Sequence, residues 1–308
     1  MKNLKYQDRG TVIHRLNPLP KLTWGGGVLV LSLLFDHPLY VLSLLVVVIA
    51  LALTAKIGRE WFSIMNFSLW LGASVIVINA LVSYHGAHVL VEAPFKLPVM
   101  GTPVITVEAI AFGTVMALRL LVIISTFTLL NLTIHPDDIM AALLKMKFPY
   151  KSVMITSLST RFVPCLIEDE SRISDGHRAR GLELENGSWL RRVKNRAVIT
   201  VPLLANSLDR AVQVAEAMEA RAFGTGKRRT YYKDIKITPV DAVMLGYSLL
   251  PLAFGILVNF GGYGDYQYYP VLQAANTGLR EYFILFVLVA LLIMILPLAL
   301  LKRRLDLD

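Results

Sequence analysis

The chain has 308 residues, of which 55% are hydrophobic and only 17% are charged, and its formal net charge is +9. Soluble domains carry roughly 25% charged residues, and the mean hydropathy here is +0.58. The composition excludes a soluble globular fold, a disordered chain and a collagen-like fibre. A disulfide-linked secreted scaffold is also excluded, because Cys165 is the only cysteine. We therefore expect most of the chain to lie in lipid.

The first apolar stretch covers residues 22–55 and follows a polar segment, residues 1–21, that we expect to be a cytosolic N-terminus. Asp36-His37-Pro38 interrupts the stretch and predicts a turn. The half before the turn, Leu22–Phe35, would be about 21 Å long as a helix, against a hydrocarbon core of roughly 30 Å. It is therefore either a short helix or a re-entrant one. Gly25-Gly26-Gly27 in this half permits either close packing against another helix or local bending.

Four further apolar stretches are long enough to be membrane helices. They cover residues 61–84, 105–131, 239–259 and 282–301. The sequence therefore predicts an all-α polytopic membrane protein with about six transmembrane helices. Four of these helices are expected in residues 22–131 and two in residues 239–301.

The positions of lysine and arginine predict the orientation of these helices. Of the 31 basic residues, 28 lie on one side of the expected membrane, and only Lys96 and Arg280 lie in the loops on the other side. We expect the basic side to be the cytosol, which places both termini there, including residues 302–308. The chain is then a multi-pass protein of the cell (inner) membrane. Topology accounts for the basic excess, so no nucleic-acid partner is expected.

Residues 132–238 have a helical pattern without a lipid signal, and we expect a cytosolic helical domain there. Pro136-Asp137-Asp138 begins a first helix, since proline and acidic residues suit a first turn, and Phe148-Pro149 ends it. A second helix is expected over about residues 151–180. Its Pro164 lacks an N–H and permits a kink.

A third helix is expected over about residues 189–223, with Gly224 at a left-handed C-cap. Apolar residues at helical spacing form a stripe along it, namely Val201, Leu204, Leu208, Val212 and Ala215. The last part of the helix is rich in alanine. These alanines are either ordinary helix-forming residues or a surface for close packing of the two long helices.

The sequence contains no catalytic motif, so we expect a chain that is not an enzyme and holds no cofactor or metal. The nearest approach to a phosphate loop is Gly224–Arg228, but it lacks the first glycine and the Ser/Thr of that motif. His85 and His88 have a spacing that permits metal ligation, but no carboxylate or thiol is near them in the sequence, and we assign no metal site. We expect Cys165 to be a small buried apolar residue.

Both long helices end in Ala-Arg followed by a small residue, as Ala179-Arg180-Gly181 and Ala220-Arg221-Ala222. With His14-Arg15-Leu16-Asn17-Pro18, Pro136-Asp137-Asp138 and Arg161-Phe162-Val163-Pro164, these segments resemble the transmembrane (T) component of energy-coupling factor (ECF) transporters for vitamins and transition metals. The resemblance covers nearly the whole chain and rests on the order and spacing of the segments. It departs at Ala222, where the family usually has glycine, a change that bears on the cap geometry more than on Arg221.

The resemblance implies a protein that joins two cytosolic ABC-type ATPases to a small membrane-embedded substrate-capture (S) subunit. It implies that ATP binds to the ATPases and that two long coupling helices carry their motion to the S subunit during uptake of a vitamin or metal. The residues expected to dock on the ATPases are Ala179, Arg180, Gly181, Ala220, Arg221 and Ala222. Those with a supporting role are Met218, Glu219, Arg161 and Arg119.

Several alternatives stay open. Arg180 and Arg221 would also complement the negative ends of their helix dipoles. Arg119 lies in the middle of an expected span, where a charge often marks function. We favour a structural role for it, bonding helix ends or carbonyls inside the bundle. Glu108 is too far along the helix for a direct pair. The other candidate functions are a self-sufficient secondary carrier, for which Arg119 and Asn79 are the strong midplane candidates, and a membrane scaffold without a transport role.

Overall fold

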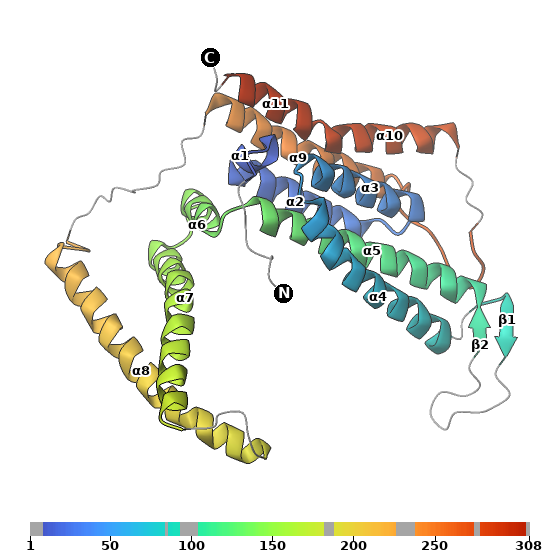
Figure 1. The fold of residues 1–308 in the computed structure, drawn as a ribbon. Helices are drawn as coiled ribbons and strands as arrows, with labels where there is room; N and C mark the ends of the chain where they lie inside the picture. Colours follow the sequence, from blue (N-terminus) through green and yellow to red (C-terminus); the bar gives the residue numbers. More distant parts are fainter. Residues whose placement is uncertain are drawn as a thin grey trace. The chain divides into compact units, whose positions relative to one another are not determined.

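A computed structural model describes residues 9–83, 86–92, 104–181, 188–225, 238–273 and 278–305. Most of these residues are helical (Figure 1). The chain divides into two compact units, one formed by Met1–Ile139 with Ile235–Asp308 and the other by Met140–Asp234. The first unit contains α1 (Val12–Arg15), α2 (Pro18–Leu34), α3 (Pro38–Thr54), α4 (Gly58–Val82), α5 (Val107–Thr133), α9 (Pro239–Phe260), α10 (Leu279–Ile293) and α11 (Ile295–Leu305).

Four helical segments of the first unit are long and apolar enough to cross a membrane. They are Gly58–Val82, Val107–Thr133, Pro239–Phe260 and Leu279–Lys302, the last running from α10 into α11. The helices α2 and α3 are also apolar but have only 17 residues each, or about 26 Å. The prediction of an all-α polytopic membrane protein is confirmed.

Helix α2 begins four positions earlier than the sequence suggested, at Pro18 instead of Leu22. The Asn17 side chain accepts a hydrogen bond from the Leu19 N–H at 3.2 Å, and Pro18 occupies the first helical position. Asparagine is a preferred N-cap and proline suits the first turn. Residues 18–21, expected in the N-terminal segment, therefore belong to the helix.

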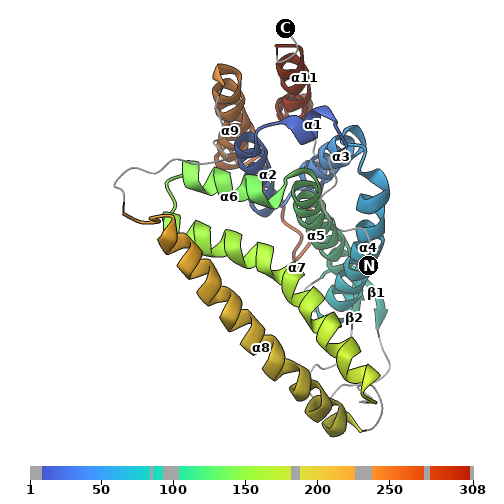
Figure 2. The same ribbon diagram turned by 60° about the vertical axis from the view of Figure 1, so that its left-hand side comes forward.

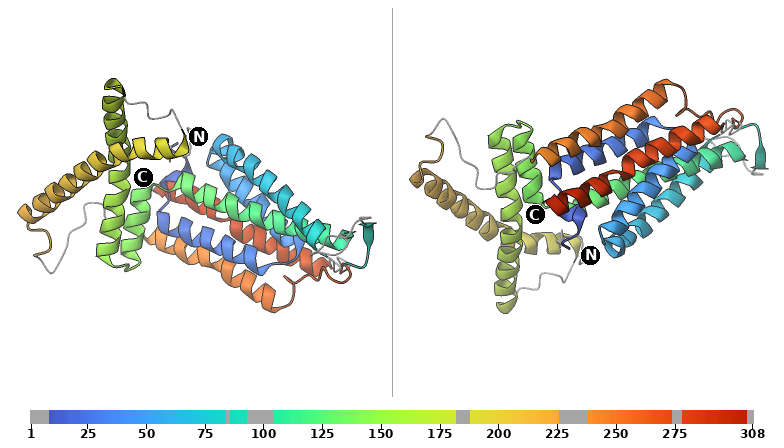
Figure 3. Two further views of the ribbon diagram at one scale, coloured as in Figure 1. Left: turned by 90° about the horizontal axis from the view of Figure 1, so that it is seen from below. Right: turned by 90° about the horizontal axis from the view of Figure 1, so that it is seen from above.

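The turn between α2 and α3 lies beside the middle of α5. At one end of α2, Lys21 Nζ donates to the Thr133 carbonyl at 3.1 Å, and at the other end Arg119 Nη2 donates to the Phe35 carbonyl at 2.9 Å. Since α2 runs antiparallel to α5 between these contacts, residues 107–118 of α5, about 18 Å of helix, extend past the turn. The α2–α3 pair is thus a short hairpin inside the bundle (Figure 3).

The loop after α9 packs onto this turn. The Gly264 carbonyl accepts hydrogen bonds from the Asp36 and His37 N–H groups at 2.9 and 3.0 Å. The Tyr268 hydroxyl donates to the Asp36 carbonyl at 2.6 Å. The backbone groups of the turn are therefore satisfied by protein, as membrane depth requires.

Small residues allow close approach of helices in the first unit. A Cβ at Gly25 would lie 2.7 Å from a Leu130 side-chain atom of α5, whereas one at Gly26 would meet open space. Of the two readings of the triple glycine, close packing is the one seen at Gly25. At Gly113, where α5 packs on α4, a Cβ would lie 3.1 Å from the Ile76 Cα.

A short antiparallel hairpin precedes α5, with β1 (Val89–Glu92) paired to β2 (Val104–Thr106). The sequence analysis predicted only a loop here. Both strands consist mainly of β-branched and other apolar residues, which favour strands, but each is too short to stand out among loop residues.

The second unit contains α7 (Tyr150–Ala179) and α8 (Trp189–Ala220), and α6 (Pro136–Lys145) runs across the boundary between the units. The predicted starts and ends of these helices agree with the structure within a few residues. Helix α7 continues through Pro164 as one element.

Candidate functional site

The two long helices of the second unit form an antiparallel hairpin (Figure 2). Arg210 Nη2 of α8 lies 2.6 Å from Asp169 Oδ2 of α7. The rings of Tyr150 and Phe223 are 6.3 Å apart between centroids. The beginning of α7 therefore lies beside the end of α8.

The apolar stripe predicted on α8 does not face α7. Val201 is 70% exposed and Leu204, Leu208 and Val212 are each more than half exposed. The less exposed positions of the helix follow another line at helical spacing, namely Ile199, Leu203, Ser207, Arg210, Val214 and Met218. The alanines of α8 are also exposed, so α7 and α8 do not pack against each other through these alanines.

Arg180 ends α7 as its C-cap residue, with φ −89° and ψ 8°. Gly181 follows in the left-handed region at φ +84°, and its N–H donates to the Arg178 carbonyl at 2.9 Å. Glycine is the residue that tolerates this conformation without strain. The helix therefore stops abruptly and leaves the Arg180 side chain exposed at its end.

Arg221 ends α8 in the same way, although the next residue is not glycine. Ala222 adopts φ +54°, its N–H donates to the Glu219 carbonyl at 2.8 Å, and the Phe223 N–H donates to the Met218 carbonyl at 2.9 Å. These two bonds define a Schellman C-cap. The left-handed cap forms at Ala222, two positions before the expected Gly224, and Gly224 is itself left-handed at φ +96°. The C-cap at Ala222 therefore forms without glycine.

The two arginines lie at opposite ends of the hairpin. Arg221 is next to the Tyr150 end of α7, and Arg180 is at the other end of that 30-residue helix, about 45 Å away. Within the described ranges, neither guanidinium has a hydrogen-bond or ion-pair partner. Each can therefore offer its full set of donors to a carboxylate or to carbonyls of another chain.

The predicted supporting residues are spread along the helices. Met218 and Glu219 lie in the last turn of α8, next to Arg221, with Met218 half-buried and Glu219 exposed. Arg161 is exposed on α7, about 28 Å along the helix from Arg180. The structure therefore groups Met218 and Glu219 with one arginine and does not bring Arg161 to the end of α7.

Arg119 bonds a helix end and a carboxylate inside the first unit. Its Nη2 lies 2.7 Å from Asp36 Oδ1 and 2.9 Å from the Phe35 carbonyl at the end of α2. These contacts are of the kind expected from the sequence, which is bonding to a helix end or a carbonyl. The sequence did not identify Asp36 as the partner of Arg119, because Asp36-His37-Pro38 predicts only a turn.

His88 does have a carboxylate beside it, contrary to the sequence-based reasoning. Its Nδ1 lies 2.7 Å from Glu108 Oε1, and its backbone N–H donates to the same carboxylate at 3.2 Å. His85 lies outside the described residues. In the part of the chain that the structure describes, no three His, Cys, Asp or Glu residues form a metal-sized cluster. Cys165, expected to be buried, is only partly buried.

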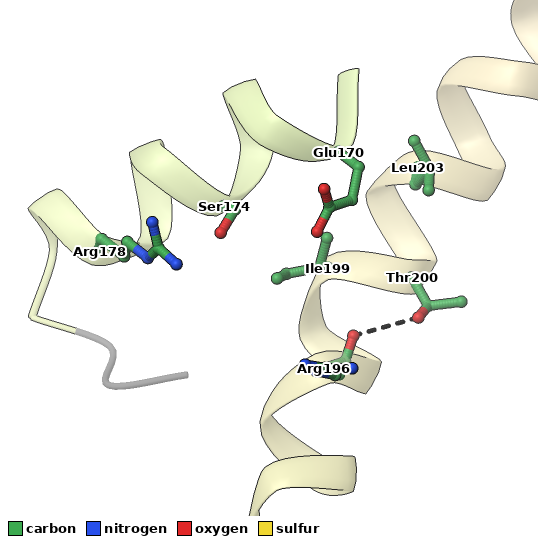
Figure 4. A pocket seen from close by; sticks show the side chains of 7 residues that line it. All are labelled: Glu170, Ser174, Arg178, Arg196, Ile199, Thr200 and Leu203. Atoms are coloured by element: carbon green, nitrogen blue, oxygen red, sulfur yellow. Dashed lines mark hydrogen bonds between the residues drawn. The ribbon is translucent and has the colours of Figure 1, made fainter. Parts of the chain in front are cut away.

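A polar cavity of about 320 Å³ opens between α7 and α8 (Figure 4). It is lined by Glu170, Ser174, Arg178, Arg196, Ile199, Thr200 and Leu203. Thr200 Oγ1 donates back to the Arg196 carbonyl at 3.1 Å. Arg178 has Asp175 as an ion-pair neighbour at 3.7 Å, so the charges lining this cavity are partly balanced within α7.

Apolar helices long enough to cross a membrane, followed and preceded in the chain by a helical hairpin with an exposed arginine at each end, define a polytopic membrane protein with a helical extension. The chain belongs to the family described as cobalt transport protein (CbiQ), which matches residues 9–232. The resemblance to the transmembrane components of ECF transporters is thereby confirmed.

Curated relatives carry the name energy-coupling factor transporter transmembrane protein EcfT. The relative from Bacillus selenitireducens is 30% identical over 271 residues, which is 84% of this chain and 97% of the relative. The relative from Listeria innocua is 28% identical over 78% of this chain and 91% of its own length. The one from Lactococcus lactis subsp. cremoris has the same identity and the same coverage. The chain is therefore a transmembrane component of this class of transporter.

Proposed function

We propose that this chain couples two cytosolic ABC-type ATPases to a small membrane-embedded S subunit in an importer for a vitamin or a transition metal. ATP binds and is hydrolysed on the ATPases, and this chain carries their motion to the S subunit. The observation that supports this most is the pair of exposed arginines, Arg180 and Arg221, at opposite ends of one hairpin.

The chemistry of the two helix ends suits docking to protein. An exposed guanidinium makes bidentate, charge-assisted hydrogen bonds to carboxylates, and arginine is enriched at interface hot spots. Each end is also set by a left-handed residue, Gly181 or Ala222, which fixes where the chain turns away from the arginine. A separation of about 45 Å gives each arginine its own partner surface, as two ATPases require.

The placement in the membrane follows from charge. With 28 of 31 basic residues on one side, the positive-inside rule puts both termini and the α7–α8 hairpin in the cytosol, where ATPases reside. The apolar bundle then lies in the cell (inner) membrane. This explanation of the basic charge needs no nucleic-acid partner.

Copurification from mild detergent tests the proposal, followed by mass spectrometry of the bound proteins. The tagged chain should bring down ABC-type ATPases and a small hydrophobic membrane protein. Arg180→Glu combined with Arg221→Glu should lose the ATPases and keep the membrane fold. The matched control, Arg172→Glu with Arg196→Glu, makes the same charge change at exposed positions away from the two ends, and should keep them.

Two results would contradict the proposal. One is a wild-type chain that purifies alone under conditions that preserve other membrane complexes. The other is equal recovery of ATPases with the Arg180/Arg221 variant and with its control, since this would show that the helix ends are not the docking residues.

A further inference from the structure

A buried lysine caps the end of α5. Lys21 is only 6% exposed, and its Nζ donates to the Thr133 and His14 carbonyls, each at 3.1 Å. Thr133 is the last residue of α5, where backbone carbonyls lack helical partners and carry partial negative charge. The ammonium therefore ties α5 to α1 and α2 by directional bonds at one point.

A buried aspartate forms a second junction at the start of α9. Asp241 is 2% exposed. Its carboxylate accepts from the Thr238 N–H at 3.1 Å and hydroxyl at 2.9 Å, from Lys302 Nζ at 2.6 Å, and from Asn17 Nδ2 at 3.4 Å. One side chain thus connects the α9 capping box, α11 and the N-cap of α2.

These two junctions lie where the chain passes between the units. After Thr133, only residues 134–139 precede the second unit, and after that unit only residues 235–237 precede Thr238. Asn17 and Lys21 are four positions apart at the start of α2. This one segment therefore contacts both junctions. We name Asn17, Lys21, Asp241 and Lys302 the clasp.

We propose that the clasp residues are positioning residues that hold the two connections between the units against the bundle. Motion of the α7–α8 hairpin then moves the bundle helices and is not absorbed by the connections. This inference rests on the coupling function proposed above. The physical reason is that buried, hydrogen-bonded charges have one favourable geometry, and displacing a partner leaves a charge unsatisfied in a low dielectric. An apolar contact at the same place would slide more easily.

Double electron–electron resonance on the purified complex with its ATPases tests the clasp. Spin labels are attached at Asp209→Cys in α8 and Ser63→Cys in α4, both exposed positions, in a Cys165→Ser background. Distances are measured without nucleotide and with ATP plus vanadate. We expect the unmodified clasp to give a narrow distribution that shifts with nucleotide.

Lys21→Met and Asp241→Asn should each broaden that distribution and reduce the nucleotide-dependent shift at least twofold, while ATPases still copurify and hydrolyse ATP. Asp241→Asn keeps the side-chain shape, so it remains informative if Lys21→Met folds poorly. Lys21→Arg, which can still donate to both carbonyls, should restore the shift. Lys56→Met, which changes an exposed lysine at the α3–α4 turn, is the matched control and should have no effect.

The outcomes separate the two proposals. If the parent complex shifts with nucleotide and Lys21→Met and Asp241→Asn shift equally with equal width, the clasp is overturned and the coupling function stands. If the parent carries ATPases but shows no shift, or carries none, the coupling function is overturned, and the role of the clasp falls with it.

Discussion

The Arg119 guanidinium lies 2.7 Å from the Asp36 carboxylate and joins the middle of α5 to the turn between α2 and α3. The Arg119 side chain is 14% exposed and that of Asp36 is 49% exposed. The same guanidinium nitrogen caps the end of α2 through the Phe35 carbonyl. The pair therefore fixes how far the short hairpin reaches along α5.

Removing one partner of this pair should destabilise the membrane unit. We expect Asp36→Asn or Arg119→Met to cost about 1–3 kcal/mol, because a charge or a carbonyl loses its partner away from water. The melting temperature of the detergent-solubilised chain checks this. Arg119→Met combined with Asp36→Asn should cost less than the sum of these two single changes, and strict additivity would show that the contact contributes nothing to stability.

The Asp169–Arg210 contact should hold α7 and α8 together. Asp169 is largely buried, and Arg210→Ala leaves its carboxylate without that partner, at a cost of about 1–3 kcal/mol. Amide hydrogen exchange in the contacting turns should accelerate by about tenfold for each 1.4 kcal/mol. The exchanged pair Asp169→Arg with Arg210→Asp should recover part of the protection. No recovery would mean that packing, and not this ion pair, sets the hairpin.

The two helix ends should respond in opposite ways to exchange of alanine and glycine. A left-handed residue with a Cβ costs about 1–2 kcal/mol relative to glycine, so Ala222→Gly should stabilise the cap by about 0.5–1 kcal/mol after the entropy of glycine is counted. Gly181→Ala should destabilise its cap through backbone strain alone, since a Cβ there meets no atom within 4 Å.

Hydrogen exchange of the Phe223 amide, which bonds to Met218, reports on the α8 cap. We expect slower exchange in Ala222→Gly. Ala217→Gly, five positions earlier and inside the helix, is the control and should speed exchange, because glycine weakens a helix interior. If both variants speed exchange, the left-handed conformation of Ala222 is wrong.

Most of the helices could be predicted from the sequence because they depend on local patterns. The long spans α4, α5 and α9 are mainly apolar runs, and the end of α7 follows from Ala179-Arg180-Gly181. Helix α8 ends at Ala220, a few residues before the expected end at Phe223. The start of α2 was placed late because apolar character alone was used there, whereas Asn17 and Pro18 set the true boundary.

The parts that could not be predicted depend on which helices become neighbours. Asp36 and Arg119 are 83 positions apart, and their pairing requires α2 to lie against α5 in one register. Asp241 and Asn17 are 224 positions apart. On α8 the line of less exposed residues mixes apolar side chains with Ser207 and Arg210, so hydrophobicity alone favoured the more apolar stripe, which is exposed. The face of α8 that contacts α7 could be identified only from the exposed fractions of its side chains.

Photo-crosslinking in living cells tests whether ATPases dock at Arg180 and Arg221, as proposed. Benzoylphenylalanine is incorporated in place of Arg180, Arg221 or, as a control, Arg172, an exposed arginine on α7 about 12 Å from its end. The account predicts adducts with an ABC-type ATPase at positions 180 and 221 and few at 172. Absence of ATPase adducts at both ends, or equal yields at all three positions, would contradict it.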